Sequence, residues 1–119
     1  MRLAEPPFAI SEAPSETELV AKYFRALGDP TRLRILELLA AAELSVGEIV
    51  DRLELPQPKV SNHLACLRWC GFVASRREHR VVHYRLADER VVRAIDLARG
   101  LLADSADRIA ACDRIDGGC

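Results

Sequence analysis

Two cysteines, Cys66 and Cys70, stand four residues apart in the middle of the chain. If this stretch is helical, they lie on one side of the helix with Cβ atoms about 6 Å apart, so both sulfurs can bind one ion. His63 points roughly the same way. Thiolates select soft ions such as cadmium, lead, mercury or arsenite over magnesium or manganese. The spacing therefore indicates a soft-metal site.

The same stretch carries polar side chains suited to a nucleic acid. Val60, Leu64 and Leu67 recur at helical spacing and predict the buried stripe of a helix over residues 57–70. Off that stripe lie four polar residues, Gln57, Lys59, Ser61 and Asn62. Amides and hydroxyls can bond to base edges in the major groove, and lysine to bases or phosphate. We expect one helix both to read DNA and to hold metal-binding thiols.

Three helices are predicted ahead of this one. Residues 15–18 form a capping-box pattern that opens the first helix, which Gly28 ends. Asp29-Pro30 starts the second, which is apolar almost all round, and residues 45–48 form a second capping box before a short third helix. The prolines of residues 55–58 make a turn into the organising helix. A short helix, a tight turn and a helix with a polar outer face form a helix-turn-helix.

A hairpin and one long helix are predicted after Gly71. Residues 72–77 and 81–86 are rich in β-formers and predict two strands joined by a basic tip at 78–80. The last helix is expected from Asp88 to about Asp113, with a heptad-like seam of Val91, Ile95, Ala98, Leu102, Ser105, Ile109 and Cys112. The predicted fold is mainly α with a small β-hairpin, in the order ααααββα: a winged helix-turn-helix.

Size and composition favour a small intracellular domain that assembles with a second copy. A chain of 119 residues builds only a modest core, so we expect a homodimer through the first and last helices. No apolar run or signal peptide is visible, which favours the cytoplasm and no membrane contact. There thiols stay reduced, and the four cysteines are candidate ligands. We expect a flexible arm over 1–14, one domain over 15–113 and a flexible tail over 114–119.

Positive charge gathers where the hairpin and the reading helix meet. Residues 59–85 contain six Lys or Arg residues against Glu78 alone, although the whole chain has a formal net charge of −1. We expect Arg76, Arg77 and Arg80 to contact the DNA backbone beside the groove. No Gly-x-Ser-x-Gly elbow surrounds Ser61, so we expect neither an enzyme nor a small organic substrate.

Two motifs together closely resemble the ArsR/SmtB family of winged-helix metal-responsive repressors. They are residues 27–36, Leu-Gly-Asp-Pro-Thr-Arg-Leu-Arg-Ile-Leu, and residues 60–67, Val-Ser-Asn-His-Leu-Ala-Cys-Leu. The likeness runs from about Ala21 to Cys112. It implies a dimeric repressor that binds an inverted-repeat operator near its own promoter and leaves it when metal binds. It also implies that His63 is a structural or backbone-contacting residue and no metal ligand.

The family places metal sites at alternative positions, and only one of them matches this chain. Ser45 and Gly47 stand where one class of member has cysteines, and no histidine follows His83 to build a zinc site on the last helix. The pair Cys66 and Cys70 resembles the CmtR-like cadmium and lead sensors, whose third thiolate comes from the C-terminal region of the other subunit. That resemblance implies Cys112 as the third ligand.

Three departures from the family leave alternatives open. His79 stands in the wing turn where glycine is frequent, which predicts a strained or longer turn, and Pro56 stands where a capping Ser or Thr is frequent. Cys119 has no counterpart and is a fourth ligand, an alternative to Cys112, or a bystander. A redox- or persulfide-sensing repressor of the same fold, with Cys66 or Cys70 pairing with Cys112, is the main alternative. A small thiol enzyme or metal-buffering protein would not need the reading face.

Overall fold

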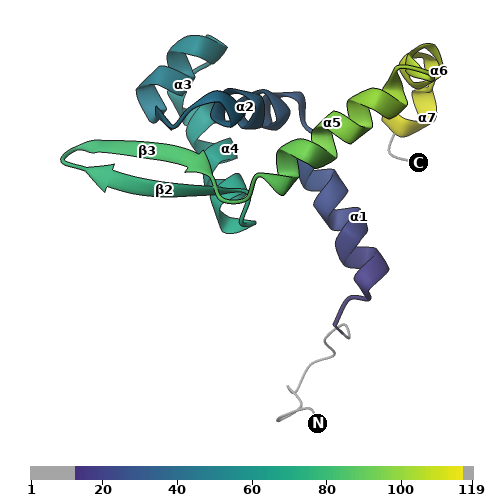
Figure 1. Cartoon of the computed structure of the whole chain (residues 1–119), viewed down its shortest axis with the longest axis horizontal. Helices are drawn as coiled ribbons and strands as arrows, with labels where there is room; N and C mark the ends of the chain where they lie inside the picture. The colour runs from purple at the N-terminus through teal and green to yellow at the C-terminus, as the bar shows by residue number, and fades with distance from the viewer. Residues whose placement is uncertain (1–12, 117–119) are drawn as a thin grey trace.

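The computed structural model describes residues 13–116 and confirms a mainly helical winged helix-turn-helix (Figure 1). Its elements are α1 Glu16–Leu27, α2 Pro30–Ala41, β1 Leu44–Ser45, α3 Val46–Leu53, α4 Gln57–Trp69, β2 Val73–Glu78, β3 Val81–Leu86, α5 Arg90–Leu102, α6 Ala106–Ala111 and α7 Asp113–Asp116. The β2–β3 hairpin, here called the wing, projects to one side, whereas α1 and α5–α7 extend to the other. Cys119 and residues 1–12 of the predicted arm lie outside the described residues.

Three helices begin where the sequence predicts. At α1 the Ser15 hydroxyl accepts a hydrogen bond from the Glu18 N–H at 3.1 Å, and the Glu18 carboxylate accepts from the Ser15 N–H at 3.0 Å. Ser45 and Glu48 form the same reciprocal box at α3. The Asp29 side chain caps the first turn of α2. Each bond satisfies a helix-terminal N–H that otherwise has no partner in the helix.

Helix α4 is weakly capped at its start and firmly closed at its end. Pro56 stands at the N-cap position and makes no side-chain cap, as predicted. At the other end Gly71 adopts φ +83°, and the Phe72 N–H donates to the Leu67 carbonyl at 2.9 Å in a Schellman motif. This closure fixes Cys70, the C-cap residue, against the body of the domain.

The sheet has three strands, because the sequence analysis missed β1. The strand order is β1-β3-β2, all antiparallel, with Leu44 opposite Tyr84 and Ser45 opposite His83. A strand of two residues is too short to show alternation, and its partner lies about forty residues away in the chain, so no local pattern reveals it. This strand attaches the base of the wing to the helical body.

The wing itself forms with a tighter turn than expected. Glu78 pairs with Val81, so β2 extends one residue further than predicted and only His79 and Arg80 form the turn. His79 has φ +57°, the left-handed region that glycine adopts without strain. The strained turn predicted from the departure at His79 is therefore present.

The prediction of one continuous last helix from Asp88 to about Asp113 is wrong, because the chain breaks after Leu102. The Ser105 N–H donates to the Leu102 carbonyl at 2.9 Å, and its hydroxyl donates to the Leu101 carbonyl at 3.3 Å. These local bonds tighten the turn and compete with continued α-helix. Gly100, just before the break, also has low helix propensity. Helix α7 follows and occupies the start of the predicted flexible tail.

The core is built around α2 and α4. Fourteen apolar side chains are buried: Leu27, Ile35, Leu36, Leu39, Leu44, Ile49, Leu53, Val60, Leu64, Leu67, Phe72, Val73, Val91 and Ile95. The three residues of the predicted α4 stripe are each 0% exposed, which confirms the face that this helix buries. The predicted seam is divided, since Val91 and Ile95 turn into this core while Leu102 and Ile109 stay exposed.

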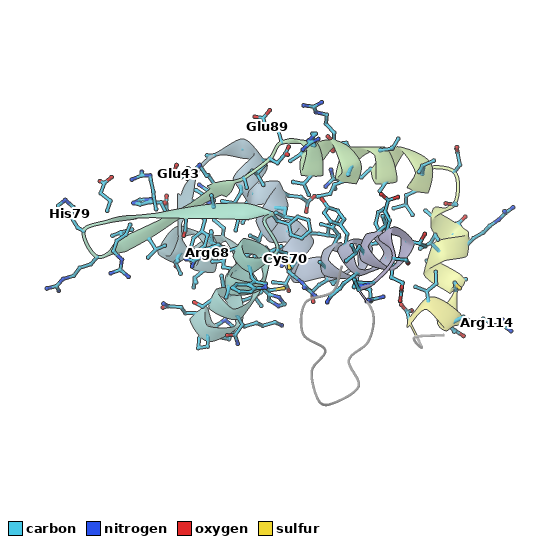
Figure 2. All side chains as sticks on the ribbon, turned by 90° about the horizontal axis from the view of Figure 1, so that it is seen from below. Glu43, Arg68, Cys70, His79, Glu89 and Arg114 are labelled. Carbon is cyan, nitrogen blue, oxygen red and sulfur yellow. The ribbon has the colours of Figure 1, made fainter. Side chains whose placement is uncertain are left out.

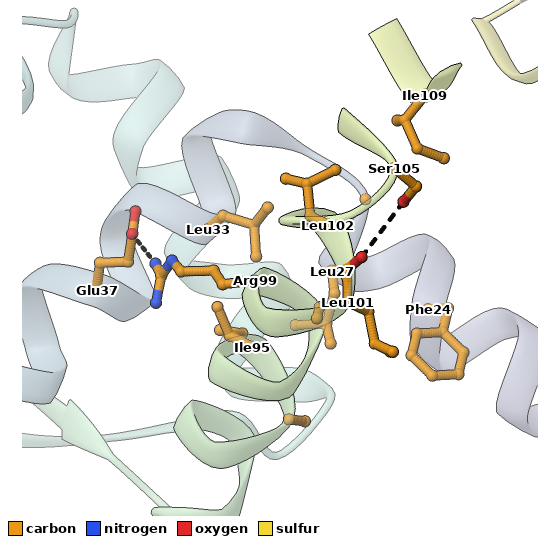
Figure 3. Close-up of a pocket in the computed structure, with 13 residues that line it drawn as sticks. Phe24, Leu27, Leu33, Glu37, Ile95, Arg99, Leu101, Leu102, Ser105 and Ile109 are labelled. Carbon is orange, nitrogen blue, oxygen red and sulfur yellow. Dashed lines mark hydrogen bonds and ion pairs between the residues drawn. The ribbon is translucent and has the colours of Figure 1, made fainter. Parts of the chain in front are cut away.

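Exposed apolar side chains lie on the half of the molecule opposite the wing. Phe24 is 63% exposed and Leu101 is 67% exposed, and both line a groove between α1, α2 and α5–α6 (Figure 3). An ion pair between Glu37 and Arg99 bounds this groove. Contiguous exposed apolar surface of this kind marks a contact with another molecule. None of the helices within residues 13–116 has the length and apolar character needed to cross a bilayer.

The closure of α4 predicts opposite effects of two glycine substitutions. Gly71→Ala should lower the free energy of unfolding by about 1 kcal/mol, because a β-carbon is strained at positive φ although the space around it is open. Gly47→Ala, inside α3 with no close neighbour, should raise it by up to about 1 kcal/mol. Urea unfolding at one fixed protein concentration measures both. Equal effects of the two substitutions would contradict this account of the α4 terminus.

Candidate metal site and nucleic-acid interface

Cys66 and Cys70 open into one cavity at the junction of α1, α2 and α4, here called the thiol cavity. Its lining residues are Leu19, Lys22, Tyr23, Arg25, Ala26, Arg32, Cys66, Trp69, Cys70 and Phe72. Cys66 is half-buried and Cys70 is exposed, and both are free thiols. The cavity measures about 570 Å³ and is open to solvent, so it has room for an ion and a further side chain.

An arginine from α2 contacts the inner sulfur. The Arg32 guanidinium donates a hydrogen bond from Nη1 to Cys66 Sγ at 3.3 Å. Its Nε is buried and has no hydrogen-bond partner among the described residues. A guanidinium is always charged, and hydrogen bonds to it favour the thiolate form of a sulfur. Arg32 therefore supplies positive charge at the position where the ligand sulfur lies.

The outer thiol is influenced by the inner one. Burial raises the pKa of the Cys70 thiol, and the charge of Cys66 together with a hydrogen bond between the two sulfurs raises it further. Arg32 and Lys22 oppose this increase without cancelling it. The two sulfurs are thus close enough to share a proton or an ion, as the spacing of four residues predicts.

A third ligand is missing from the part of one chain that the structure describes. Within residues 13–116 no three His, Cys, Asp or Glu side chains are grouped so that they could hold a metal ion. Cys112 lies half-buried between α6 and α7, at the end of the molecule away from α4 (Figures 1 and 2). It does not line the thiol cavity. The two sulfurs of one chain therefore form an incomplete site for a soft ion, and another subunit has to complete it.

The polar face of α4 is available to a large partner. Gln57, Lys59 and Asn62 are exposed, and Ser61 is half-buried. These four residues, the reading face, project from a helix whose opposite side is fully buried in the core. The structure therefore presents them together at the first two turns of α4.

His63 differs in its surroundings from the reading face. It is half-buried and lies near the Asp29 cap of α2. Burial acts to raise the pKa of Asp29, but the Arg32 N–H bond and the nearby His63 imidazole lower it overall. His63 and Cys66, one turn apart on α4, thus face Asp29 and Arg32, one turn apart on α2.

The wing arginines are not equivalent. Arg76 Nε lies 2.6 Å from a Glu43 carboxylate oxygen, and its Nη1 lies 2.7 Å from a Glu78 oxygen. Arg77 and Arg80 are exposed, and His79 marks the tip of the wing beside them (Figure 2). Arg76 is therefore engaged with two carboxylates, whereas Arg77 and Arg80 have no such partners among the described residues.

Sequence reasoning missed two of these contacts. Arg32 was quoted within the family motif but given no role, although a charged residue in a helix as apolar as α2 is a usable signal. Glu43 was read as part of a connecting segment, and its pairing with Arg76 depends on β1, which was itself not predicted. Both contacts join segments more than thirty residues apart in the chain.

The fold and this arrangement define a winged helix-turn-helix regulatory protein, and comparisons agree. Residues 29–75 match the family model described as "Bacterial regulatory protein, arsR family". The "Probable mercury resistance operon repressor" of Streptomyces lividans is 41% identical over 110 residues, covering 92% of this chain and 88% of that protein. The transcriptional regulator CmtR of Mycobacterium tuberculosis is 41% identical over 100 residues, covering 83% and 85%.

A solved structure supports the same conclusion. A homodimeric winged helix-turn-helix DNA-binding domain from Mycobacterium bovis has a TM-score of 0.65 and 32% identity, covering 82% of this chain and 92% of that one. The chain therefore belongs to the arsR family of bacterial regulatory proteins, and the resemblance stated from the sequence is confirmed. Its relatives are transcriptional regulators, which supports a DNA-binding role and no enzymatic one.

The raised pKa of Cys70 predicts its reactivity. At neutral pH a smaller fraction of this thiol is ionised than of an ordinary cysteine, and the thiolate is the nucleophile. In metal-free protein the alkylation rate of Cys70 by iodoacetamide, followed by mass spectrometry, should rise with pH to a midpoint above that of the same residue in urea. Cys66→Ser should move the midpoint down, because the neighbouring sulfur charge is removed. A folded-state midpoint at or below the unfolded one would refute this electrostatic description.

Proposed function

We propose that the protein is a transcriptional repressor that binds an inverted-repeat operator as a homodimer and is released by a soft metal ion bound to cysteine thiolates. The observation that carries this proposal is the position of Cys66 and Cys70 on α4, the helix that also bears the reading face. The family membership and the names of the relatives support it. We propose the cytoplasm as its location.

DNA binding by two copies follows from the exposed surfaces. The apolar groove of Figure 3 and the exposed side chains of α1 are suited to contact a second copy, and the Mycobacterium bovis domain of the same fold is homodimeric. Two α4 helices related by a dyad would enter successive major grooves about 34 Å apart. Gln57, Ser61 and Asn62 would bond to bases, Lys59 to bases or phosphate, and Arg77 and Arg80 to the adjacent backbone.

Metal recognition in this proposal rests on sulfur. Cys66 and Cys70 provide two thiols from α4, and we propose that Cys112 of a second copy provides the third. The thiol cavity borders α1, part of the proposed subunit contact, so the end of another chain can reach it. Three thiolates fit large soft ions, cadmium or lead first, with mercury and arsenite as further candidates. A relative named for mercury resistance supports this class of ion.

Coupling between metal and DNA follows from how the ligands are attached. Cys66 and Cys70 are fixed to α4, and Cys112 to the α6–α7 end, so drawing their sulfurs together changes how α4 sits relative to the second copy. Coupling between two sites commonly amounts to about 1–3 kcal/mol, roughly 5- to 150-fold in affinity. A change of that size suffices to release a repressor.

A redox- or persulfide-sensing repressor is the second candidate. The Arg32 contact makes the surroundings of Cys66 electropositive, which is typical of reactive cysteines. The raised pKa of Cys70 argues against reactivity of that second thiol. Release of DNA by peroxide or persulfide in metal-free protein, without response to cadmium, would favour this alternative.

Cysteine substitutions test the proposed site. Cys66→Ser, Cys70→Ser and Cys112→Ser should each bind the upstream region of the protein's own gene as wild type does but no longer leave it when cadmium is added. Serine preserves the shape of the side chain and removes the soft ligand. Gel shifts titrated with cadmium, lead, mercury and arsenite measure the response.

Cys119→Ser is the matched control, because this residue lies beyond the described region and outside the proposed set of three. It should respond to cadmium as wild type does. Normal release of the Cys66 or Cys70 variant would refute the site. Loss of response in Cys119→Ser, with Cys112→Ser unaffected, would assign the third ligand to Cys119.

The two neighbouring wing arginines give a paired test of phosphate contact. Arg77→Ala should reduce the slope of log K against log salt concentration by about one unit, because one phosphate contact is lost. Arg76→Ala should change the slope less, since Glu43 and Glu78 already engage that guanidinium. Salt-titrated binding to the operator measures both slopes. An unchanged slope for Arg77→Ala would remove it from the interface.

A further inference from the structure

Arg32 is placed to sense the charge of whatever the thiol cavity holds. Its guanidinium lies 3.3 Å from Cys66 Sγ, while its Nε is buried without a hydrogen-bond partner among the described residues. Lys22 and Arg25 also line the cavity, and none of its lining residues is a carboxylate. The cavity is therefore positively charged around two soft ligands and has unused donor capacity.

The position of Arg32 is set by the fold rather than by its own flexible side chain. Its backbone N–H donates to the Asp29 cap at 3.1 Å, in the first turn of α2, and α2 packs on α4 within the core. The contacts of Asp29 with His63 and of Arg32 with Cys66 join the same two helix faces, one turn apart on each. The guanidinium consequently faces the sulfur before any ion binds.

Soft ions that use the same three thiols produce sites of different charge. A divalent ion that binds three cysteine thiols releases three protons, and the resulting complex carries one negative charge. Arsenous acid and three thiols give a neutral complex and three water molecules. A fixed positive charge in a partly buried site stabilises an anionic product and has little effect on a neutral one.

We propose that Arg32 is a specificity-determining residue of the thiol site, which favours divalent soft cations over arsenite by stabilising the anionic three-thiolate complex. This inference rests on the proposed metal-sensing function. Arg32 does not ligate the ion; it acts through its hydrogen bond to Cys66 and through its charge. Hydrogen bonds to charged groups typically change an equilibrium by about 10- to 100-fold, so an effect of that order is expected.

The test compares two effectors in charge-altered variants of the full-length, reduced, metal-free protein. Arg32→Met and Arg32→Gln remove the charge, Arg32→Lys retains it, and Arg34→Met removes an exposed charge from the same helix outside the cavity. Dissociation constants for Cd²⁺ and arsenite are measured by chelator or dithiol competition at one pH and salt concentration. Thermal unfolding shows which variants stay folded, and either neutral variant suffices.

The neutral variants should bind Cd²⁺ about 10- to 100-fold more weakly and arsenite less than about threefold more weakly. The Arg32→Lys variant should keep most of the wild-type preference, and Arg34→Met all of it. Equal losses for both effectors, no loss for Cd²⁺, or an Arg32→Lys preference as low as that of the neutral variants would overturn the inference. Wild-type protein that binds neither effector through its cysteines would instead refute the proposed function.

Discussion

The burial of one face of α4 is the constraint on which the rest of the structure depends. Val60, Leu64 and Leu67 are fully enclosed by the core, so this helix can neither rotate nor slide without losing apolar contacts. Fixing that face also fixes the two others. One presents polar groups outward at the start of the helix, and one presents two sulfurs to the thiol cavity near its end. Any force on the sulfurs therefore acts on a rigid element that carries the reading face.

Local features of this fold could be predicted from the sequence. The capping boxes at Ser15 and Ser45, the cap at Asp29 and the closure at Gly71 all depend on residues within a few positions of each other. The burial of the α4 stripe follows from its periodicity in the same way. Because family membership rests on such local motifs, it too could be recognised before any coordinates were available.

What could not be predicted depends on contacts between distant segments. Strand β1 exists because β3 pairs with it, and Arg76 is held by Glu43 because that pairing brings the two residues together. The bond from Arg32 to Cys66 requires the packing of α2 against α4. The break near Ser105 was visible only as a weak local preference, and the regular seam of apolar residues concealed it. The reading face and the wing arginines stay predictions, since no bound DNA tests them.

The position of Trp69 gives this protein an intrinsic optical signal. It is the single tryptophan of the chain, it is adjacent to Cys70, and it lines the thiol cavity with 92% of its surface exposed. All indole emission of the protein therefore comes from the immediate surroundings of the two sulfurs. Occupancy of the cavity by a heavy atom or by a segment of another subunit can be followed through quenching or a spectral shift of that emission, in real time and without a label.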